Sequence, residues 1–226
     1  MKLSIIIPTL NEEGVIRSSL TALAALRRSG HEVIIVDGGS RDNTVALAQP
    51  LADKVITSQA GRATQMNAGT RFSHGDVLVF LHADTRLPPN SDILIINGLK
   101  QYAKVWGRFD VHLGGRQPSL RIIETMMNWR SRLSAIATGD QCLFIRREIF
   151  TAVGGYPEIK LMEDIAISSL LKRYGRPLCI TQKAITSSRR WQQRGILRTI
   201  LLMWRLRIGY FFGENTQYLA QRYQQP

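Results

Sequence analysis

The chain has 226 residues, of which 44% are hydrophobic and 21% are charged. This balance suits one folded domain with a buried core, and it excludes a disordered protein, a collagen-like repeat and a disulfide-stapled miniature. The two cysteines show no CxxC spacing, so we expect no zinc ribbon and a reducing compartment. No apolar run approaches the roughly 18 residues of a membrane span, and the run at the start is too short for a secretory signal. We therefore expect a cytoplasmic location.

The charge is strongly basic, with 30 Lys and Arg residues against 17 Asp and Glu residues and a net charge of +13. Such an excess predicts an anionic partner: nucleic acid, a membrane surface or a phosphorylated ligand. Residues 183–226 hold eight basic residues and one acid, a net of +7, and the preceding 182 residues carry the remaining +6. The sequence thus describes a nearly ordinary domain followed by a basic tail.

The first half of the chain alternates apolar, β-branched runs with helix-like segments. The first two runs start about 30 residues apart, which is the spacing of a βαβ unit. Continuous apolar runs are typical of strands buried on both faces, so the alternation predicts a mostly parallel sheet covered by helices. The expected strands are residues 3–7, 33–36, 54–57 and 77–81, and the expected helices are residues 11–28, 42–52 and 62–72.

After Pro88 and Pro89 the pattern becomes mixed. A parallel first half and a mixed second half predict one α/β sandwich domain over residues 1–191. Residues 192–226 would then form a basic C-terminal tail with an amphipathic helix at 195–213. The expected helices of the second half are residues 93–102, 120–136 and 163–174, and the expected strands are residues 106–113, 142–145 and 178–185, with a turn at 154–157.

Polar residues follow three of the expected strands. They are Pro8 and Thr9, residues 37–40, and residues 82–84. Ligands of open parallel sheets lie beyond the carboxyl ends of the strands, so we expect these groups to converge on one site. Asp37 precedes two glycines that allow the backbone to bend. Its carboxylate suits a ribose or a base, and a plain turn role is the alternative.

Two further motifs carry acidic groups suited to catalysis. His82 and Asp84 are two residues apart on an extended chain, so their side chains point the same way. Mg²⁺ and Mn²⁺ take one or two carboxylates together with phosphate oxygens, and His82 suits Mn²⁺ better. Glu163 and Asp164 open a helix, where one carboxylate facing a cleft would act as a general base. A turn at Asp84 and a helix cap at residues 163–164 are the structural alternatives.

Other catalytic templates are absent from the sequence. It contains no GxG dinucleotide fingerprint, no GK[ST] phosphate loop and no GxSxG nucleophile elbow, and its four histidines lack zinc spacing. The strand-end and acidic motifs therefore carry the functional interpretation.

Together, these motifs resemble the family 2 glycosyltransferases of the GT-A fold. The resemblance covers about residues 3–191 and rests on five motifs in the family's order. It implies a nucleotide-sugar donor and a divalent metal ion, Mn²⁺ or Mg²⁺. The five motifs are SIIIPTLNE at 4–12, IVDGGSRDNT at 35–44, the path from Arg62 through NAG at 67–69 and GD at 75–76 to HADT at 82–85, GGY at 154–156, and ED at 163–164 followed by LKRYG.

The resemblance also implies roles for residues. The reaction would be an inverting single displacement, in which Asp164 takes the proton of the acceptor and Glu163 assists. Asp84 and His82 would hold the metal ion that neutralises the departing diphosphate. The residues implied in binding the nucleotide-sugar are Pro8, Thr9, Asn11, Glu12, Asp37, Gly38, Arg62, Asn67, His82, Ala83, Asp84, Arg190 and Trp191.

Two departures from the family pattern narrow this expectation. The first acidic position of the family's DxD motif is His82, whereas Asp84 keeps the position of the direct metal ligand. Residues 187–191 resemble the QxxRW motif of processive members but lack its glutamine, which implies transfer of a single sugar. The variants look most like a small bacterial subgroup named for arsenosugar biosynthesis or for glycosylation of carotenoid acids. This implies a lipid- or carotenoid-type acceptor with a hydroxyl or carboxyl group.

The tail helix expected at residues 195–213 pairs basic and apolar faces. This pattern is typical of an interfacial helix on anionic lipid, so we expect peripheral contact with the inner face of the plasma membrane. Packing on its own domain or on a second copy in a homodimer is the alternative. The arginines on one face are Arg194, Arg198 and Arg205, and the opposite face holds Ile196, Leu197, Ile200, Met203, Trp204 and Phe211.

Two other functions are weighed against a glycosyltransferase. A sugar nucleotidyltransferase would need a basic, glycine-rich loop after the first strand, whereas residues 8–12 are acidic and contain no glycine. A basic module for nucleic acid or membrane surfaces would explain the net charge but not the strand-end motifs. We therefore expect a nucleotide-sugar partner and no nucleic acid.

Overall fold

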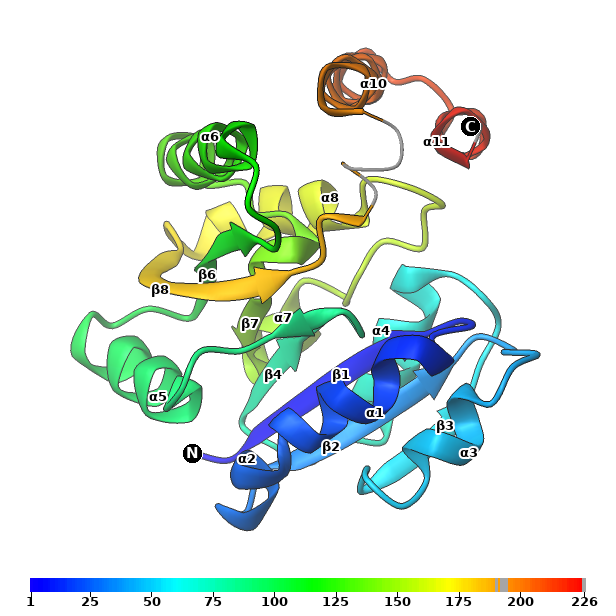
Figure 1. The fold of residues 1–226 in the computed structure, drawn as a ribbon. Coiled ribbons are helices and arrows are strands. Elements are labelled where there is room, and N and C mark those ends of the chain that lie inside the picture. The colour runs from blue at the N-terminus through cyan, green and yellow to red at the C-terminus, as the bar shows by residue number, and fades with distance from the viewer. Residues whose placement is uncertain (190, 192–194, 225–226) are drawn as a thin grey trace.

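The computed structural model describes residues 1–189, 191 and 195–224. Within them, an eight-stranded sheet runs in the order β3-β2-β1-β4-β7-β6-β8-β5, with helices on its faces (Figure 1). The strands are β1 (Leu3–Thr9), β2 (Glu32–Asp37), β3 (Lys54–Thr57), β4 (Val77–Phe80), β5 (Thr85–Arg86), β6 (Trp106–Leu113), β7 (Leu143–Arg146) and β8 (Leu178–Thr186). The helices are α1 (Glu13–Ala22), α2 (Ala24–Arg28), α3 (Thr44–Ala48), α4 (Arg62–Arg71), α5 (Ser91–Gln101), α6 (Pro118–Ser134), α7 (Arg147–Ala152), α8 (Glu163–Leu171), α10 (Ile196–Phe211) and α11 (Thr216–Gln224), with the 3-10 turns η1 (Gly139–Gln141) and η2 (Lys172–Tyr174).

The predicted sheet is confirmed in both halves. Strands β3, β2, β1 and β4 are parallel neighbours, and β7 then pairs antiparallel with both β4 and β6. Strand β8 runs parallel to β6, and β5 runs antiparallel to β8. In this register Thr9 lies beside Asp37, so the carboxyl ends of β1 and β2 are level.

Alternate residues of the central strands feed two apolar layers, as the two-residue period of a strand requires. On one face Ile5, Ile7 and their neighbours pack against Ile16, Leu20 and Ile95 of the helices α1 and α5. On the other face lie Ile6, Val36 and Phe80, which pack against Met66, Phe150 and Ile167 of the helices α4, α7 and α8. Since both faces are covered, the continuous apolar runs in the sequence are explained.

Several boundaries differ from the prediction. The helix expected at residues 42–52 is limited to α3, because the side chain of Asp42 accepts bonds from Thr44 N and Oγ1 at its start and Pro50 lacks an amide hydrogen near its end. The helix expected at 11–28 begins at Glu13, since Asn11 has a positive φ of 54°, and it divides at Leu23 into α1 and α2. The short elements β5, α7 and α11 were not predicted.

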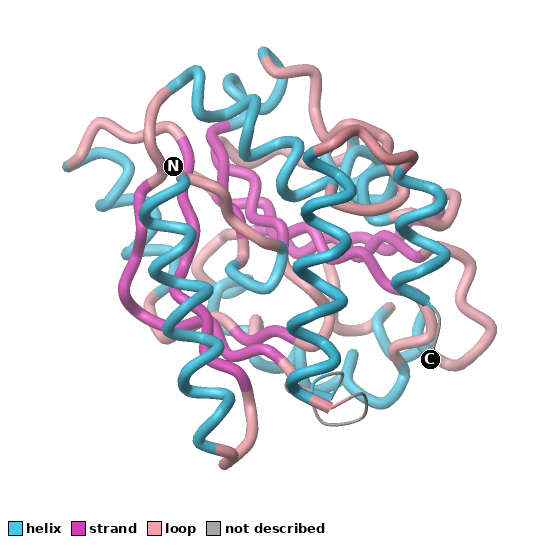
Figure 2. The backbone as a smooth tube through the Cα atoms, turned by 90° about the horizontal axis from the view of Figure 1, so that it is seen from above, coloured by secondary structure: helices cyan, strands magenta, loops and turns pink. Residues whose placement is uncertain are grey.

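Helices α6, α10 and α11 lie side by side on the face seen from above in Figure 2. The start of α10 packs against α6, with Ile196 and Ile200 touching a cluster that includes Leu120 and Ile123. Further along, Leu206 of α10 packs with residues just before α8 and with α11. Among the described residues, no helix is long and apolar enough to cross a membrane.

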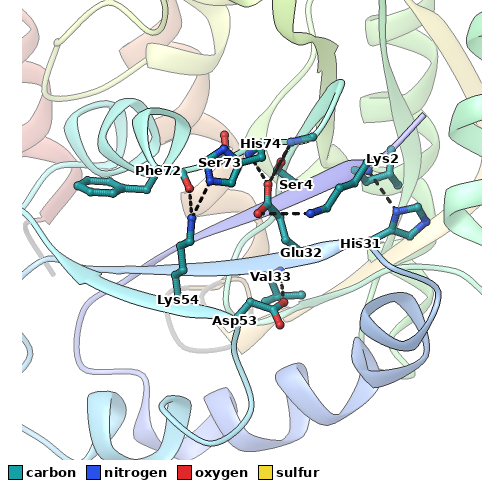
Figure 3. A network of polar contacts seen from close by, with 12 residues as sticks. Lys2, Ser4, His31, Glu32, Val33, Asp53, Lys54, Phe72, Ser73 and His74 are labelled. Carbon is teal, nitrogen blue, oxygen red and sulfur yellow. Dashed lines mark hydrogen bonds and ion pairs between the residues drawn. The ribbon is translucent and has the colours of Figure 1, made fainter.

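A polar network closes the amino-terminal edge of the sheet (Figure 3). The carboxylate of Glu32 accepts hydrogen bonds from Ser4 Oγ at 2.6 Å, from Gly75 N at 3.0 Å and from His74 N. The ammonium group of Lys2 lies 3.8 Å from its second oxygen. Burial alone would raise the pKa of Glu32, but these bonds and the ammonium group outweigh burial and hold the pKa below its usual value. The network fixes the turn before β4.

Candidate active site

The carboxyl ends of β1 and β2 meet in a tightly bonded turn. The buried carboxylate of Asp37 accepts hydrogen bonds from Gly39 N at 2.9 Å, Ser40 N at 2.8 Å and Ser40 Oγ at 2.5 Å. Thr9 Oγ1 donates to the same carboxylate at 3.4 Å. Gly39 has a φ of 94°, a conformation that favours glycine. The turn role considered for Asp37 is therefore present, and the bonds hold its carboxylate at the end of the strand.

The turn after β1 is bonded to the turn after β2. Asn11 N donates to Ser40 Oγ at 2.8 Å, and Glu12 N donates to Thr44 Oγ1 at 2.7 Å. Behind them, the Nε2 atom of Gln65 donates to the carbonyl oxygens of Thr9 and Val36 at 2.9 and 2.7 Å. A side chain at Gly38 would come within 3.1 Å of this Gln65 amide. Gln65, which the sequence interpretation missed, thus supports the floor of the site together with Pro8 and Thr9 in β1.

Asp84 follows β4 and faces a second carboxylate, that of Glu12. The pKa of Glu12 is raised by burial and by the charge of Asp84, while Arg189 and Arg62 act in the opposite direction. Two carboxylates held close together destabilise each other until a cation lies between or beside them. Ser19 Oγ bonds the buried carbonyl of Ala83 at 2.5 Å and thereby fixes the chain beside Asp84.

These carboxylates fit a hard divalent cation whose remaining ligands come from a diphosphate and water. Within the described part of the chain, no group of three or more His, Cys, Asp or Glu side chains could hold a metal ion by itself. The ring of His82 is engaged elsewhere: Nδ1 lies 3.4 Å from Asp140 Oδ1, and a Cβ on Gly139 would come within 2.4 Å of Nε2. Among the described residues, Asp84 and Glu12 are thus candidate oxygen donors for such an ion, and His82 contacts η1.

Glu163 and Asp164 lie in the first turn of α8. Asp164 Oδ2 accepts a bond from Gly139 N at 2.9 Å, and Oδ1 accepts one from Ile165 N at 2.8 Å. Glu163 is buried, and its nearest cation is Arg62 Nη1 at 3.9 Å from Oε1. Burial and the neighbouring Asp164 raise the pKa of Glu163, and Arg62 only partly offsets them. A buried carboxyl group with a raised pKa beside a second carboxylate is typical of acid–base sites.

Arg62 links the two acidic pairs. It lies near Glu163 and also acts on the charge of Glu12, which itself faces Asp84. It stands at the first position of α4, and its side chain is about half exposed. A guanidinium group in this place can bind phosphate oxygens while remaining paired with carboxylates.

Two predicted site residues, Asn67 and Trp191, have other surroundings. Asn67 donates from Nδ2 to Tyr156 O at 2.8 Å and accepts from Tyr156 N at 2.9 Å, so its amide clamps the 154–156 turn against α4. Trp191 packs against the apolar cluster of β6 and α6. Arg190 lies outside the described residues. The side chains of Thr85 and Thr186 are hydrogen-bonded at 2.9 Å, so the end of β8 lies next to the residue that follows Asp84. Arg189, just beyond β8, acts to lower the pKa of Glu12 and was not predicted as a site residue.

Comparison with known proteins identifies the family of the chain. The family described as Glycosyl transferase family 2 matches residues 4–154. A probable glycosyltransferase, YdaM of Bacillus subtilis (strain 168), is 29% identical over 97% of this chain and 57% of its own length. A dolichol-phosphate mannosyltransferase of Pyrococcus furiosus is 30% identical over 69% of this chain and 45% of its own length. The chain thus spans about half the length of these curated relatives.

A solved structure shares the fold. The mannosyltransferase PcManGT from Pyrobaculum calidifontis, in complex with GDP-Man and Mn²⁺, superposes with a TM-score of 0.63. The match covers 92% of this chain and 61% of that chain at 21% identity. At this identity the likeness establishes a common GT-A fold.

Proposed function

The chain belongs to glycosyl transferase family 2 and is a glycosyltransferase, and from this premise we propose that it moves one sugar from a nucleotide-sugar to an acceptor held at a membrane surface. The observation that carries the proposal is the meeting of two carboxylate pairs, Glu12 with Asp84 and Glu163 with Asp164, around Arg62. Glu12 and Asp84 would hold the metal ion at the leaving diphosphate, and Glu163 and Asp164 would face the incoming acceptor. The family assignment overrules the non-enzymatic binding module that the net charge had suggested.

The donor side is formed by the ends of β1, β2 and β4. Asp37 and Thr9 would hold the nucleoside, with Asn11 and Gly38 shaping the turn around it. Asp84 and Glu12 would hold the divalent ion, which, when bound, neutralises the charge that develops on the departing diphosphate. Arg62 would bind the same diphosphate oxygens. The Mn²⁺ and GDP-Man in the PcManGT complex support this assignment.

The acceptor side is formed by the start of α8. In an inverting displacement the acceptor oxygen forms a bond to the anomeric carbon while the bond from that carbon to the diphosphate breaks. The proton of the acceptor passes to the carboxylate of Asp164, whose orientation is held by Gly139 N and Ile165 N. Glu163, with its raised pKa, shares the negative charge of the pair. Because residues 187–191 lack the processive glutamine, one sugar is transferred in each encounter.

Nucleotide binding tests the proposal directly. Thermal unfolding would be followed with UDP, GDP, CDP and dTDP, each with Mn²⁺ and with chelator. A ligand present at 100 times its dissociation constant should stabilise the fold by about 2.7 kcal/mol. We expect this only with the metal ion, and we expect Asp84→Asn to abolish it while the fold persists. Absence of stabilisation by all four nucleotides would refute the proposed donor site.

Membrane contact is supported by exposed apolar side chains on neighbouring helices. On α10 a stripe with alternating spacings of four and three residues is between 51% and 80% exposed, and on α6 a second stripe with the same spacing is between 56% and 70% exposed. The basic tail around them suits an anionic leaflet, and the two tryptophans suit its interface. The α10 stripe is Leu197, Leu201, Trp204, Ile208 and Phe211, and the α6 stripe is Ile122, Met126, Trp129 and Leu133.

This surface refines the apolar face predicted for the tail helix. Ile196, Ile200 and Met203 of that face are partly buried against the chain's own domain. Helix α10 therefore has one side packed on the domain and one exposed side, and the exposed stripe is available for contact with lipid. Of the predicted arginines, Arg198 and Arg205 are exposed, and Arg194 lies outside the described residues.

Vesicle co-sedimentation tests this contact. We expect wild-type protein to bind vesicles of phosphatidylglycerol and phosphatidylcholine, and the double substitution Leu201→Glu, Phe211→Glu to lose most of this binding. Phe72→Glu provides the matched control, since Phe72 is exposed at the end of α4. Equal binding of all three proteins, or of none, would leave the stripes without a lipid role.

A further inference from the structure

Two arginines outside the donor site reach the start of α8 from the overlying helices. Arg130 lies on α6 and Arg207 lies on α10. Arg130 Nη2 and Arg207 Nε are buried and have no hydrogen-bond partner among the described residues. Buried donors that lack a partner cost free energy and call for a specific explanation.

The contacts of the two helices place both guanidinium groups near Asp164. Arg130 Nη1 donates to Ile136 O at 3.5 Å, on the segment leading to Gly139, whose amide binds Asp164. Arg207 follows Leu206, which packs with Leu161 and Met162 immediately before α8. The charge of Asp164 acts on both arginines, and Arg207 acts on Arg130. The three groups therefore form one cluster.

The cluster holds two guanidinium groups whose donors its carboxylates do not fully pair. Burial and the neighbouring Arg207 lower the pKa of Arg130 to about 10, and burial also lowers the pKa of Arg207. Asp164 favours the charged form of both, and Asp140 favours that of Arg207. However, the two oxygens of Asp164 already accept bonds from backbone amides, and Asp140 also lies near His82. Two guanidinium groups, each with an unpaired donor, can therefore bind a further anion. Their planar donor arrangement matches the oxygens of a phosphate group.

We infer that Arg130 and Arg207 form a subsite for a phosphate monoester group of the acceptor, directly beside Asp164. This inference rests on the proposed function, because it gives the acceptor side of that site a ligand. It also explains why α10 packs over the catalytic domain: the helix supplies one of the two cations. A phosphate bound there would have its organic part next to α6 and α10, which carry the exposed apolar stripes.

The subsite can be tested by calorimetric titration without any turnover. The probes are dodecyl phosphate below its micelle concentration, glycerol 3-phosphate, and glycerol as the uncharged comparison. We expect the wild type to bind at least one of the phosphates and not glycerol. Arg130→Gln and Arg207→Gln should each weaken that binding at least tenfold. Arg28→Gln, an exposed arginine at the end of α2 on the other side of the molecule, should leave it unchanged.

The two phosphates distinguish the sources of the ligand. Tight binding of dodecyl phosphate alone indicates a lipid-linked acceptor, and equal binding of both indicates a small soluble phosphate ester. A wild type that binds neither, or Gln variants that bind as tightly as the wild type, would overturn the subsite.

Two controls separate this inference from folding and from the donor site. If the arginines serve a ligand, removing a buried charge should leave the unfolding temperature of the Gln variants unchanged or higher. Should those variants fail to fold, Arg130→Lys and Arg207→Lys keep the charge but lose the forked donors, and weaker phosphate binding is still expected. UDP with Mn²⁺ is titrated into the same proteins. If the variants lose phosphate binding but still bind UDP with Mn²⁺, the loss is specific to the subsite. If the wild type binds no nucleotide, the proposed donor site is refuted.

Discussion

Two glutamates at opposite ends of the sheet are buried to the same degree and behave in opposite ways. Glu32 at the amino-terminal edge and Glu163 at the start of α8 are each 6% exposed. The pKa of Glu32 is lowered, and the pKa of Glu163 is raised. Equal exposed area with opposite pKa directions shows that exposed area alone does not determine the state of a buried carboxyl group. Burial dominates at Glu163, whereas hydrogen bonds and Lys2 outweigh it at Glu32.

The difference lies in how completely each group is paired. Glu32 accepts bonds from Ser4, His74 and Gly75, with Lys2 nearby, so its charge is satisfied within the fold (Figure 3). Glu163 has Arg62 only at 3.9 Å and a second carboxylate beside it. The carboxylate at the amino-terminal edge is therefore paired within the fold, whereas the charges at the start of α8 are incompletely paired, as is typical of functional sites.

The largest effect is expected at the carboxyl edge, from Asp164→Asn. The amide preserves the size of the side chain and can still accept a backbone bond, but it cannot take a proton. Turnover should fall by about 100-fold or more, measured as release of nucleoside diphosphate from the donor that gives the largest thermal shift. Nucleotide affinity should be retained. Turnover within twofold of the wild type would transfer the base role away from Asp164.

Glu32→Gln should have the largest effect on stability. The substitution replaces charge-assisted hydrogen bonds to Oε1 with neutral ones and places an amide donor where Oε2 faces the ammonium group of Lys2. We expect a loss of about 2 kcal/mol in the free energy of unfolding at neutral pH, measured by urea denaturation. Nucleotide binding should be unaffected, because the network lies at the opposite edge of the sheet. If the variant bound nucleotide more weakly under conditions in which it is fully folded, the assignment of stability to one edge and of nucleotide binding to the other would be contradicted.

Asn67→Ala tests a predicted binding residue against its observed role as a clamp. Loss of the two hydrogen bonds to Tyr156 should cost about 1 kcal/mol of stability. If the amide only holds the turn, the dissociation constant for UDP with Mn²⁺ should not change. A tenfold weaker UDP complex with unchanged unfolding would instead restore the ligand role inferred from the sequence.

Glu163→Gln should produce the smallest change, and of the opposite sign to that of Glu32→Gln. Because the folded-state pKa of Glu163 is raised, its ionisation costs stability as the pH rises from the ordinary carboxyl range through the raised pKa. The Gln variant should therefore be as stable as the wild type at low pH and more stable at neutral pH. For Glu32, with a lowered folded-state pKa, the advantage of the wild type should be full above the ordinary carboxyl range. It should be lost as the pH falls through the lowered pKa. Urea denaturation of both variants across this range checks both signs, and parallel curves would contradict them.

The strands other than β5, and the mostly parallel arrangement of the first half, were accessible from the sequence. Residues 54–57 and 106–113 match β3 and β6 at both ends. The β-branched residues of the first segment, and the alternation of Phe109, Val111 and Leu113 with polar residues in the second, are local signals. The strand-end positions of Thr9 and Asp37 were accessible from the same patterns. The extended chain expected at His82 and Asp84 was wrong, because residues 83–84 form a turn closed by a bond from Thr85 N to His82 O. Parallel strands bring their carboxyl ends to one edge, whatever the details of packing.

The pairing of side chains was determined only by the tertiary structure. Nothing local joins Asn67 to Tyr156, 89 residues away, or His82 to Asp140, since such contacts depend on how the layers pack. The same holds for α10, whose apolar residues form one pattern in the sequence but are divided by packing into buried and exposed sets. Periodicity fixes which residues share a face. Only the assembled fold places Arg130 and Arg207 beside Asp164 and gives two equally buried glutamates opposite pKa directions, because charge and solvation are set by neighbours distant in the chain.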